Sequence, residues 1–399
     1  MLTIPEVHRG VYLEDKPQRL VVGKEWISQQ FPQTVKVSNS DIKEYIIPDI
    51  RELPKKTISH FPFEDLVVKP IEADLSLPVD EQILSVLMHS HIRRGSLEIP
   101  MQYKDEFLSK IHDAMNTNRP IEIVLPTLPF KNQNVMATGH SIGWTDLGEY
   151  LCMLQMKTIV ESVKKVYAPG AKITLLTDGT VYADLFANGD KDSVGQYFQQ
   201  LWHIKEKLGL GNDVELVDMQ WLINTEPLFA DVAQEIRTLL PQVAAEDETV
   251  AKLLQGLTYG MLFCFDTPFD MEEYMKRIFV QGGNLPKDIL SQAMDTAHEY
   301  ATFLLTMKKL DVVKKAFPHA IRGTVHCKDA AQIPLHLVNH KSWIFPYHGV
   351  PVVSRGRQER IKNWQHATRI IRLCEVYNYP SATAVYLPGE KEPFYYEVD

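Results

Sequence analysis

The 399-residue sequence lacks the short motifs that identify several common enzyme classes. No GxGxxG, GxxxxGKS/T or HExxH pattern occurs, which argues against the usual dinucleotide-binding, P-loop and zinc-protease classes. Cysteine is scarce, and the absence of CxxC or CxxH spacing indicates neither a disulfide framework nor a structural zinc site. We expect reduced thiols at all four cysteines, which are Cys152, Cys264, Cys327 and Cys374.

Long apolar runs are also missing. No window approaches the roughly 18 apolar residues of a membrane span, and the first ten residues carry Glu6, His8 and Arg9 in place of a secretory signal's apolar run. A net charge of −9 argues against a general nucleic-acid binder, because phosphate neutralisation requires a basic face. The sequence therefore predicts a cytoplasmic protein that binds neither membrane nor nucleic acid.

The first 80 residues differ in composition from the rest of the chain. They are rich in proline and contain short β-like runs, such as residues 19–22 and 44–47, which predicts a small N-terminal extension with short strands. From residue 81 onward, apolar residues recur at the 3, 4, 7 spacing of a buried helix face. We therefore expect the main domain over residues 81–399, with a helical insertion at about 195–315.

A βαβ unit is predicted near the start of this domain. Residues 121–126 are the apolar run of a buried strand, and Asp146 with Glu149 fits the capping box of a helix over 147–167. Residues 172–179 then predict a second strand that ends in a polar turn at Asp178. Because βαβ units form parallel sheets with ligands at the carboxyl ends of the strands, the 126–146 loop and the Asp178 turn should meet at one crevice.

Strand-like segments return near the carboxyl terminus. They cover residues 321–326, 335–338 and 343–353, and we expect them to form an antiparallel extension of the sheet. On such a strand Arg322 and His326 point to the same face.

Several charged residues in these loops and strands are candidates for chemistry. Arginine and lysine hold carboxylates and phosphates, so Arg322 and Lys328 suit an anionic ligand. His326, His336 and His348 suit acid–base work near neutral pH, a structural role or metal binding, and spacing does not decide among these. For Lys131, Asn134, Asp146 and Glu149 the simpler interpretation is a capping pair beside a solvated loop, and Asp178 with Asp184 can be turn chemistry alone.

Five stretches together resemble the isocyanide synthase family, which includes the pyoverdine/dityrosine biosynthesis proteins. The resemblance covers roughly residues 82–375, and several separate motifs in the same order are more specific than any one of them. The stretches are 125–134 (LPTLPFKNQN), 145–149 (TDLGE), 167–174 (YAPGAKIT) with Asp178 and Gly179, 321–326 (IRGTVH) and 345–350 (FPYHGV).

The resemblance implies a Rossmann-like α/β domain with a mainly parallel sheet flanked by helices, and a strand-rich C-terminal part. It implies that the amine of an L-amino acid, commonly tyrosine or tryptophan, condenses with the ketone of ribulose 5-phosphate, which supplies the isonitrile carbon. That scheme uses ribulose 5-phosphate as a co-substrate and needs no metal or redox cofactor. Relatives often stand beside an iron-dependent oxygenase, so functional coupling to one is expected.

Mapped onto this chain, the matching residues divide into two groups by their chemistry. The expected catalytic acids and bases are Asp146, Glu149, Asp178, His326 and His348, and the expected substrate-binding residues are Lys131, Asn134, Arg322, Lys328 and His336. Asn132 and Thr145 depart from the family's usual serine and proline, which bears on the choice of amino acid. The aromatic residues Trp144, Trp343 and Tyr347 are candidates for stacking on an aromatic substrate, although such residues are more often core.

Two other classes of function remain open at this point. One is a different lyase that acts on a phosphosugar or an amino acid in the same pocket. The other is a non-catalytic ligand-binding protein of Rossmann-like type, because fold alone does not determine function.

Overall fold

The computed structural model describes residues 24, 52–132, 138, 141–186, 190–262, 287–325, 330–339, 342, 344–355 and 364–399. The predicted strands at 19–22 and 44–47 lie outside these residues, so the division at residue 80 stays a prediction. The described residues form two compact units. One is helical and lies within 220–318, and the other is an α/β unit that contains the described residues from 52 to 219 and from 319 to 399.

The α/β unit is built around a five-stranded sheet that is parallel throughout, in the order β4-β3-β2-β5-β6. Its central strands are buried on both faces, which explains their uninterrupted apolar sequences. The α/β class predicted from the sequence is confirmed. The strands are β2 (Ile121–Pro126), β3 (Ala171–Thr177), β4 (Val214–Asp218), β5 (Ile321–Thr324) and β6 (Ile333–Pro334).

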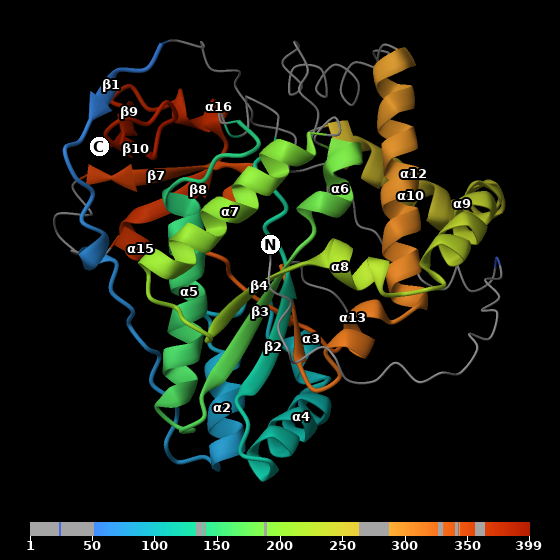
Figure 1. Ribbon diagram of the computed structural model, residues 1–399, viewed down its shortest axis with the longest axis horizontal. Coiled ribbons are helices and arrows are strands. Elements are labelled where there is room, and N and C mark those ends of the chain that lie inside the picture. Colours follow the sequence, from blue (N-terminus) through green and yellow to red (C-terminus); the bar gives the residue numbers. More distant parts are fainter. Residues whose placement is uncertain are drawn as a thin grey trace. The chain divides into compact units, whose positions relative to one another are not determined.

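Helices flank this sheet (Figure 1). The helix predicted after Asp146 is α5, and it packs against β3, while α4 packs against β2. Most of α5 is buried, including Leu147, Leu151 and Leu154, so its whole length serves as core. The helices of the unit are α2 (Val79–Leu87), α3 (Glu98–Met101), α4 (Lys104–Asn116), α5 (Leu147–Lys164), α6 (Gly179–Phe186) and α7 (Lys191–Lys207).

The helical unit is built from three helices that pack against one another, α9 (Phe229–Glu246), α10 (Glu248–Leu262) and α12 (Lys287–Lys309). Arg237 forms a bidentate pair with Glu299, and the rings of Phe229 and Phe303 lie 5.9 Å apart. No helix in the described part of the chain is long and apolar enough to cross a membrane. The unit contains α8 (Met219–Asn224), α9 (Phe229–Glu246), α10 (Glu248–Leu262), α12 (Lys287–Lys309) and α13 (Val312–Ala316).

A second, mixed sheet contains the C-terminal strands in the order β1-β9-β10-β7-β8. The expected antiparallel extension of the central sheet is therefore wrong. β5 and β6 are parallel members of the central sheet, while residues 350–354 join the second one. The strands are β1 (Lys55–Thr57), β7 (Val350–Ser354), β8 (Thr368–Ile371), β9 (Thr383–Tyr386) and β10 (Tyr395–Val398), with the short helices η4 (Pro346–His348), α15 (Trp364–Ala367) and α16 (Leu373–Val376).

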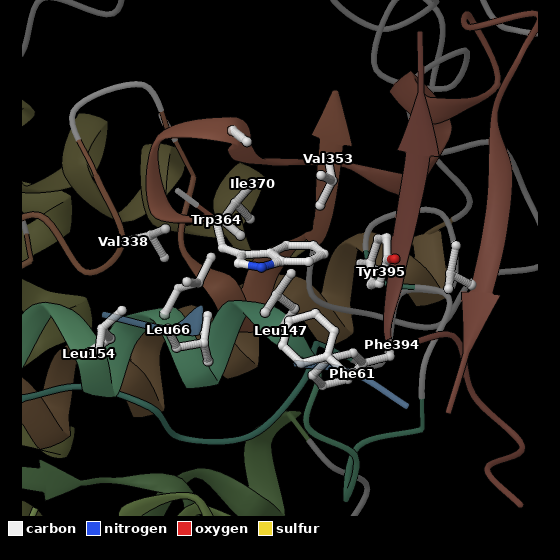
Figure 2. Packing of buried hydrophobic residues seen from close by; sticks show 13 residues of the cluster. Phe61, Leu66, Leu147, Leu154, Val338, Val353, Trp364, Ile370, Phe394 and Tyr395 are labelled. Carbon is white, nitrogen blue, oxygen red and sulfur yellow. The ribbon is translucent and has the colours of Figure 1, made fainter. Parts of the chain in front are cut away.

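An aromatic cluster fastens α5 to this second sheet (Figure 2). The ring of Phe61 lies 4.5 Å from that of Trp364 and 5.0 Å from that of Phe394, between ring centroids. Leu147, the first residue of α5, packs in the same cluster, and its backbone N–H donates to the carbonyl of Phe394. The start of α5 is therefore fixed by apolar packing as well as by its cap.

The turn after β3 lies directly against the loop after β2. A Cβ atom added at Gly179 would lie 1.9 Å from the carbonyl oxygen of Pro129, so no side chain fits there. The preceding residue of that loop, Leu128, has a φ of +58°, a conformation unusual for a branched side chain. Gly179 therefore sets how closely the two loops approach each other.

We expect Gly179→Ala to destabilise the protein by about 1–3 kcal/mol, because the added methyl group overpacks the contact with Pro129. Gly195→Ala is the matched control, since that position in α7 has open space around it and alanine favours helix by up to about 1 kcal/mol. Denaturant unfolding of both variants measures the difference. Equal stability of the two would show that the close approach is not maintained in solution.

Candidate functional site

Three polar side chains come together where adjacent strands of the central sheet end. Thr127 follows β2, Asp178 follows β3, and Arg322 lies on β5, with β2 between the other two strands. Thr127 Oγ1, Asp178 Oδ1 and Arg322 Nη1 are all inaccessible to solvent and have no hydrogen-bond partner. The region where the sequence predicts a crevice therefore contains polar atoms that the protein itself leaves unsatisfied.

The charges of Asp178 and Arg322 influence each other without a direct ion pair between them. Burial raises the pKa of Asp178 to about 7, opposed by its backbone N–H and by Arg322. Burial likewise lowers the pKa of Arg322 to about 10, opposed by the charge of Asp178. Asp218, at the end of β4, adds a second carboxylate nearby and accepts a hydrogen bond from Thr180.

An unsatisfied buried polar atom costs about 1–3 kcal/mol, so three of them on neighbouring strands need an explanation. A carboxylate oxygen supplies an acceptor, a guanidinium nitrogen supplies a donor, and a threonine hydroxyl supplies either. A ligand that carries both donors and acceptors would satisfy all three. This arrangement is typical of a polar binding site at the carboxyl end of a parallel sheet.

A second polar cluster lies in the core and is saturated. The Lys131 ammonium, which is 0% exposed, lies 2.9 Å from Asp146 Oδ2 and 3.0 Å from Glu149 Oε1, and it donates to the Pro346 carbonyl at 2.8 Å. The Tyr197 hydroxyl donates to Glu149 at 3.1 Å. The predicted capping box is confirmed, because Asp146 accepts from a backbone N–H of α5 while Glu149 accepts from the backbone N–H of Asp146.

The charges in this core cluster support one another. Although burial disfavours the ammonium, the carboxylates of Asp146 and Glu149 raise the pKa of Lys131 above its ordinary value. Burial raises the pKa of Glu149 to about 7 against the opposing charge of Lys131. The three ammonium hydrogens of Lys131 already have three acceptors within the protein. In this arrangement all three hydrogens of Lys131 have partners within the fold itself.

Lys131 and the residue after it also position His348 on η4. The next residue, Asn132, hydrogen bonds through its backbone N–H to the carbonyl of Tyr347, and its side-chain amide lies 3.3 Å from Nδ1 of His348. The ring of Tyr347 lies 4.6 Å from that of His348. Since Pro346 accepts from Lys131, the short helix η4 is held from two sides, and His348 is half-buried on it.

Other predicted residues have different outcomes. His336 lies beyond the end of β6, where its backbone N–H donates to Ile92. Asn134, His326 and Lys328, together with Trp343, lie outside the described residues. The predicted shared face of Arg322 and His326 is therefore untested.

Arg94 is a further cation at the same edge of the sheet, and the sequence motifs did not predict it. The guanidinium of Arg94 lies 4.7 Å from the centre of the Phe345 ring and donates to the carbonyl of Val325, just after β5. Arg94 belongs to none of the motifs, and only the adjacent pair Arg93-Arg94 before Gly95 marked an unusual local charge.

A GxSxG pattern at residues 139–143 does not have the context of a serine nucleophile. That role needs a serine on a sharp turn between a strand and a helix. Ser141 is exposed, β2 ends well before it at Pro126, and α5 begins after it at Leu147. We therefore assign no chemistry to Ser141.

The family model of the pyoverdine/dityrosine biosynthesis proteins matches residues 111–370, and the chain belongs to that family. The crystal structure of the PvcA protein from Pseudomonas aeruginosa is similar in fold, with a TM-score of 0.63 at 20% identity, covering 81% of this chain and 100% of that one.

Three curated relatives at low identity are isonitrile synthases. An L-tyrosine isonitrile synthase from Xenorhabdus nematophila is 24% identical over 72% of this chain and 87% of its own length. An L-tyrosine isonitrile synthase from Pseudomonas aeruginosa is 28% identical over 63% of this chain and 75% of its own. The L-tryptophan isonitrile synthase AmbI1 from Fischerella ambigua is 23% identical over 65% and 78%. The resemblance inferred from the motifs is confirmed.

We expect Lys131→Met to destabilise the protein by about 3–5 kcal/mol, because two buried carboxylates lose their counter-charge. Lys56→Met is the matched control, since Lys56 pairs with Glu397 at a partly exposed position where the pair contributes about 1 kcal/mol or less. Denaturant unfolding at neutral pH compares the two. Similar small losses in both variants would mean that the ammonium of Lys131 is not enclosed.

Stability should also depend on the protonation of Glu149. Its pKa of about 7 exceeds the ordinary 4.5, so between these values the folded state holds a proton that the unfolded chain has released. The free energy of unfolding should therefore fall as pH rises from 4.5 to 7, and Glu149→Gln should flatten this slope. Unfolding measured across that range tests this, with Asp184→Asn, at an exposed ion pair, keeping the wild-type slope. An unchanged slope in Glu149→Gln would place the ionisation elsewhere.

Proposed function

We propose that this protein is an isonitrile synthase that converts the amino group of an L-amino acid to an isocyanide, with ribulose 5-phosphate as the carbon donor. The observation that carries this proposal is the coincidence of family membership with a crevice of unsatisfied polar atoms at the carboxyl edge of the sheet. A family fold alone would support no particular chemistry. The unsatisfied polar atoms add a specific reason to expect a polar substrate at this edge of the sheet.

The amino acid is proposed to be aromatic, either tyrosine or tryptophan. The relatives from Xenorhabdus, Pseudomonas and Fischerella, which are L-tyrosine and L-tryptophan isonitrile synthases, support this choice. Aromatic side chains also stand near the end of β5, since Phe345 and Tyr347 stack at 5.4 Å on and beside η4 and Arg94, which lies over Phe345, donates to the carbonyl of Val325. An aromatic substrate would find ring partners there.

The proposed reaction needs acids and bases that work near neutral pH, and two described residues fit that need. The amine must lose a proton before it attacks the ketone, the resulting carbinolamine must lose water, and enol protons must move before carbon–carbon bonds break. Asp178, with its pKa of about 7, and His348 are the described residues to which we assign these transfers. Arg322 is assigned to an anionic group of the substrate, and Lys131, Asp146 and Glu149 to support of the crevice wall.

The direct test is incubation of the purified protein with ribulose 5-phosphate and the twenty L-amino acids, followed by trapping of isonitriles with a tetrazine and mass analysis of the adducts. The expected result is one adduct whose mass names tyrosine or tryptophan. If the folded protein binds ribulose 5-phosphate and yields no adduct, the proposed reaction is wrong, and another lyase or a binding role takes its place.

We expect His348→Gln to lower kcat by about 10²–10⁴-fold with little change in KM, because a general acid–base group acts mainly in the transition state. The variant should also lose one limb of the pH–rate profile. His112→Gln, at an exposed pair with Asp80, should keep wild-type kinetics. A His348 variant that raises KM at unchanged kcat would assign the residue to substrate binding.

A further inference from the structure

The unsatisfied atoms of the crevice have a definite pattern of charge. Asp178 supplies a carboxylate oxygen, Arg322 supplies a guanidinium nitrogen, and Thr127 follows the strand between theirs. The charged groups affect each other's pKa but form no ion pair, so an acceptor and a donor lie near each other and both stay unsatisfied. A ligand that satisfies both must present a cation to Asp178 and an anion to Arg322.

The alternative ligand is the phosphate of a phosphosugar. A phosphate placed on Arg322 would also meet the carboxylate of Asp178, which repels it. A free α-amino acid carries one charge of each sign on neighbouring atoms, and it can satisfy the carboxylate and the guanidinium together. Electrostatic complementarity therefore favours the zwitterion at this place.

We infer that Thr127, Asp178 and Arg322 form the subsite for the α-ammonium and α-carboxylate groups of a free amino acid. This inference rests on the proposed function, because it names where one of the two proposed substrates binds. Asp178 Oδ1 accepts a hydrogen bond from the ammonium, Arg322 Nη1 donates to the carboxylate, and Thr127 Oγ1 donates to the carboxylate or accepts from the ammonium. Asp178 is then the group nearest to the proton that the amine must lose.

The close contact between Gly179 and Pro129 contributes to this subsite. It holds the turn that carries Asp178 against the loop that begins at Thr127, so the acceptor and the hydroxyl keep a fixed spacing. A preformed site of this kind binds its ligand with little loss of conformational entropy.

A subsite of unsatisfied groups makes an unusual prediction about stability. Asp178→Asn and Arg322→Met each remove a buried charge that forms no ion pair, so the relieved cost of burial should offset the lost attraction between the two groups, and both variants should fold and be as stable as wild type or more so. Both should nevertheless lose amino acid binding. A purely structural role for either residue predicts the opposite outcome, namely lower stability.

The experiment measures binding with matched ligands. Wild type is first screened by thermal shift against the twenty L-amino acids, and isothermal titration then uses L-tyrosine, 3-(4-hydroxyphenyl)propionate and tyramine, with the corresponding tryptophan series. We expect Asp178→Asn to weaken binding of the amino acid and the amine by about 10–100-fold but to spare the des-amino acid. Arg322→Met should weaken binding of the amino acid and the des-amino acid but spare the amine.

Control variants carry the same chemical changes away from the crevice. Asp184→Asn and Arg119→Met, both at exposed ion pairs, should bind all ligands as wild type does. Titration of ribulose 5-phosphate completes the set, and its affinity should be unchanged in Asp178→Asn.

Three outcomes overturn the inference: a folded wild-type protein that binds none of the twenty amino acids, amino acid affinity that is unchanged in both variants, or weaker ribulose 5-phosphate binding in Asp178→Asn with amino acid binding retained. These outcomes are distinct from failure of the proposed reaction. If amino acid binding is lost in the variants as expected but wild type forms no isonitrile, the subsite is correct and the reaction is wrong. If isonitrile forms while both variants bind the amino acid normally, only the subsite is wrong.

Discussion

The enclosed ammonium of Lys131 is the interaction on which the rest of the site depends. A buried cation is tolerated only when its hydrogens all find acceptors, and here those acceptors come from the start of α5 and from the carbonyl of Pro346 on η4. Lys131 therefore joins the loop after β2 to the N-terminal cap of α5 and to η4, the short helix that carries His348. The aromatic cluster around Phe61 and Trp364 packs the same end of α5 from the apolar side.

Two groups of buried polar residues in the α/β unit differ in whether their hydrogen-bonding atoms have partners in the protein. Around Lys131 the donors and acceptors are matched within the protein, and the residues are fully buried. Around Asp178 and Arg322 one polar atom of each is left unmatched, and that atom is inaccessible to solvent although each residue as a whole is half-buried. The same residue types are thus satisfied by the fold in one cluster and left without partners in the other.

Local patterns in the sequence predicted the elements on which the site stands. The apolar run of β2, the Asp146–Glu149 capping box and the Asp178 turn are signals within a few residues, and each has its place in the structure. The saturation of Lys131 was not predictable, because its third acceptor belongs to Pro346, far along the chain. The parallel direction of β5 was also not predictable, because the sequence of a short strand does not reveal whether its partner strand runs parallel or antiparallel to it. Arg94 was missed because its position depends on Phe345 and Val325, which no local spacing connects to it.

The pairing of β5 with β2 has a consequence for the way the chain acquires its structure. Ile123 lies beside Ile321, and the helices α8 to α13 are synthesised between these two residues. The edge of β2 that receives β5 therefore stays unpaired while the ribosome completes the intervening helices, and the ammonium of Lys131 still lacks its acceptor from Pro346 during that time. Native pairings of such long sequence separation form slowly. The central sheet is therefore completed only after the chain has been synthesised as far as β5 and β6.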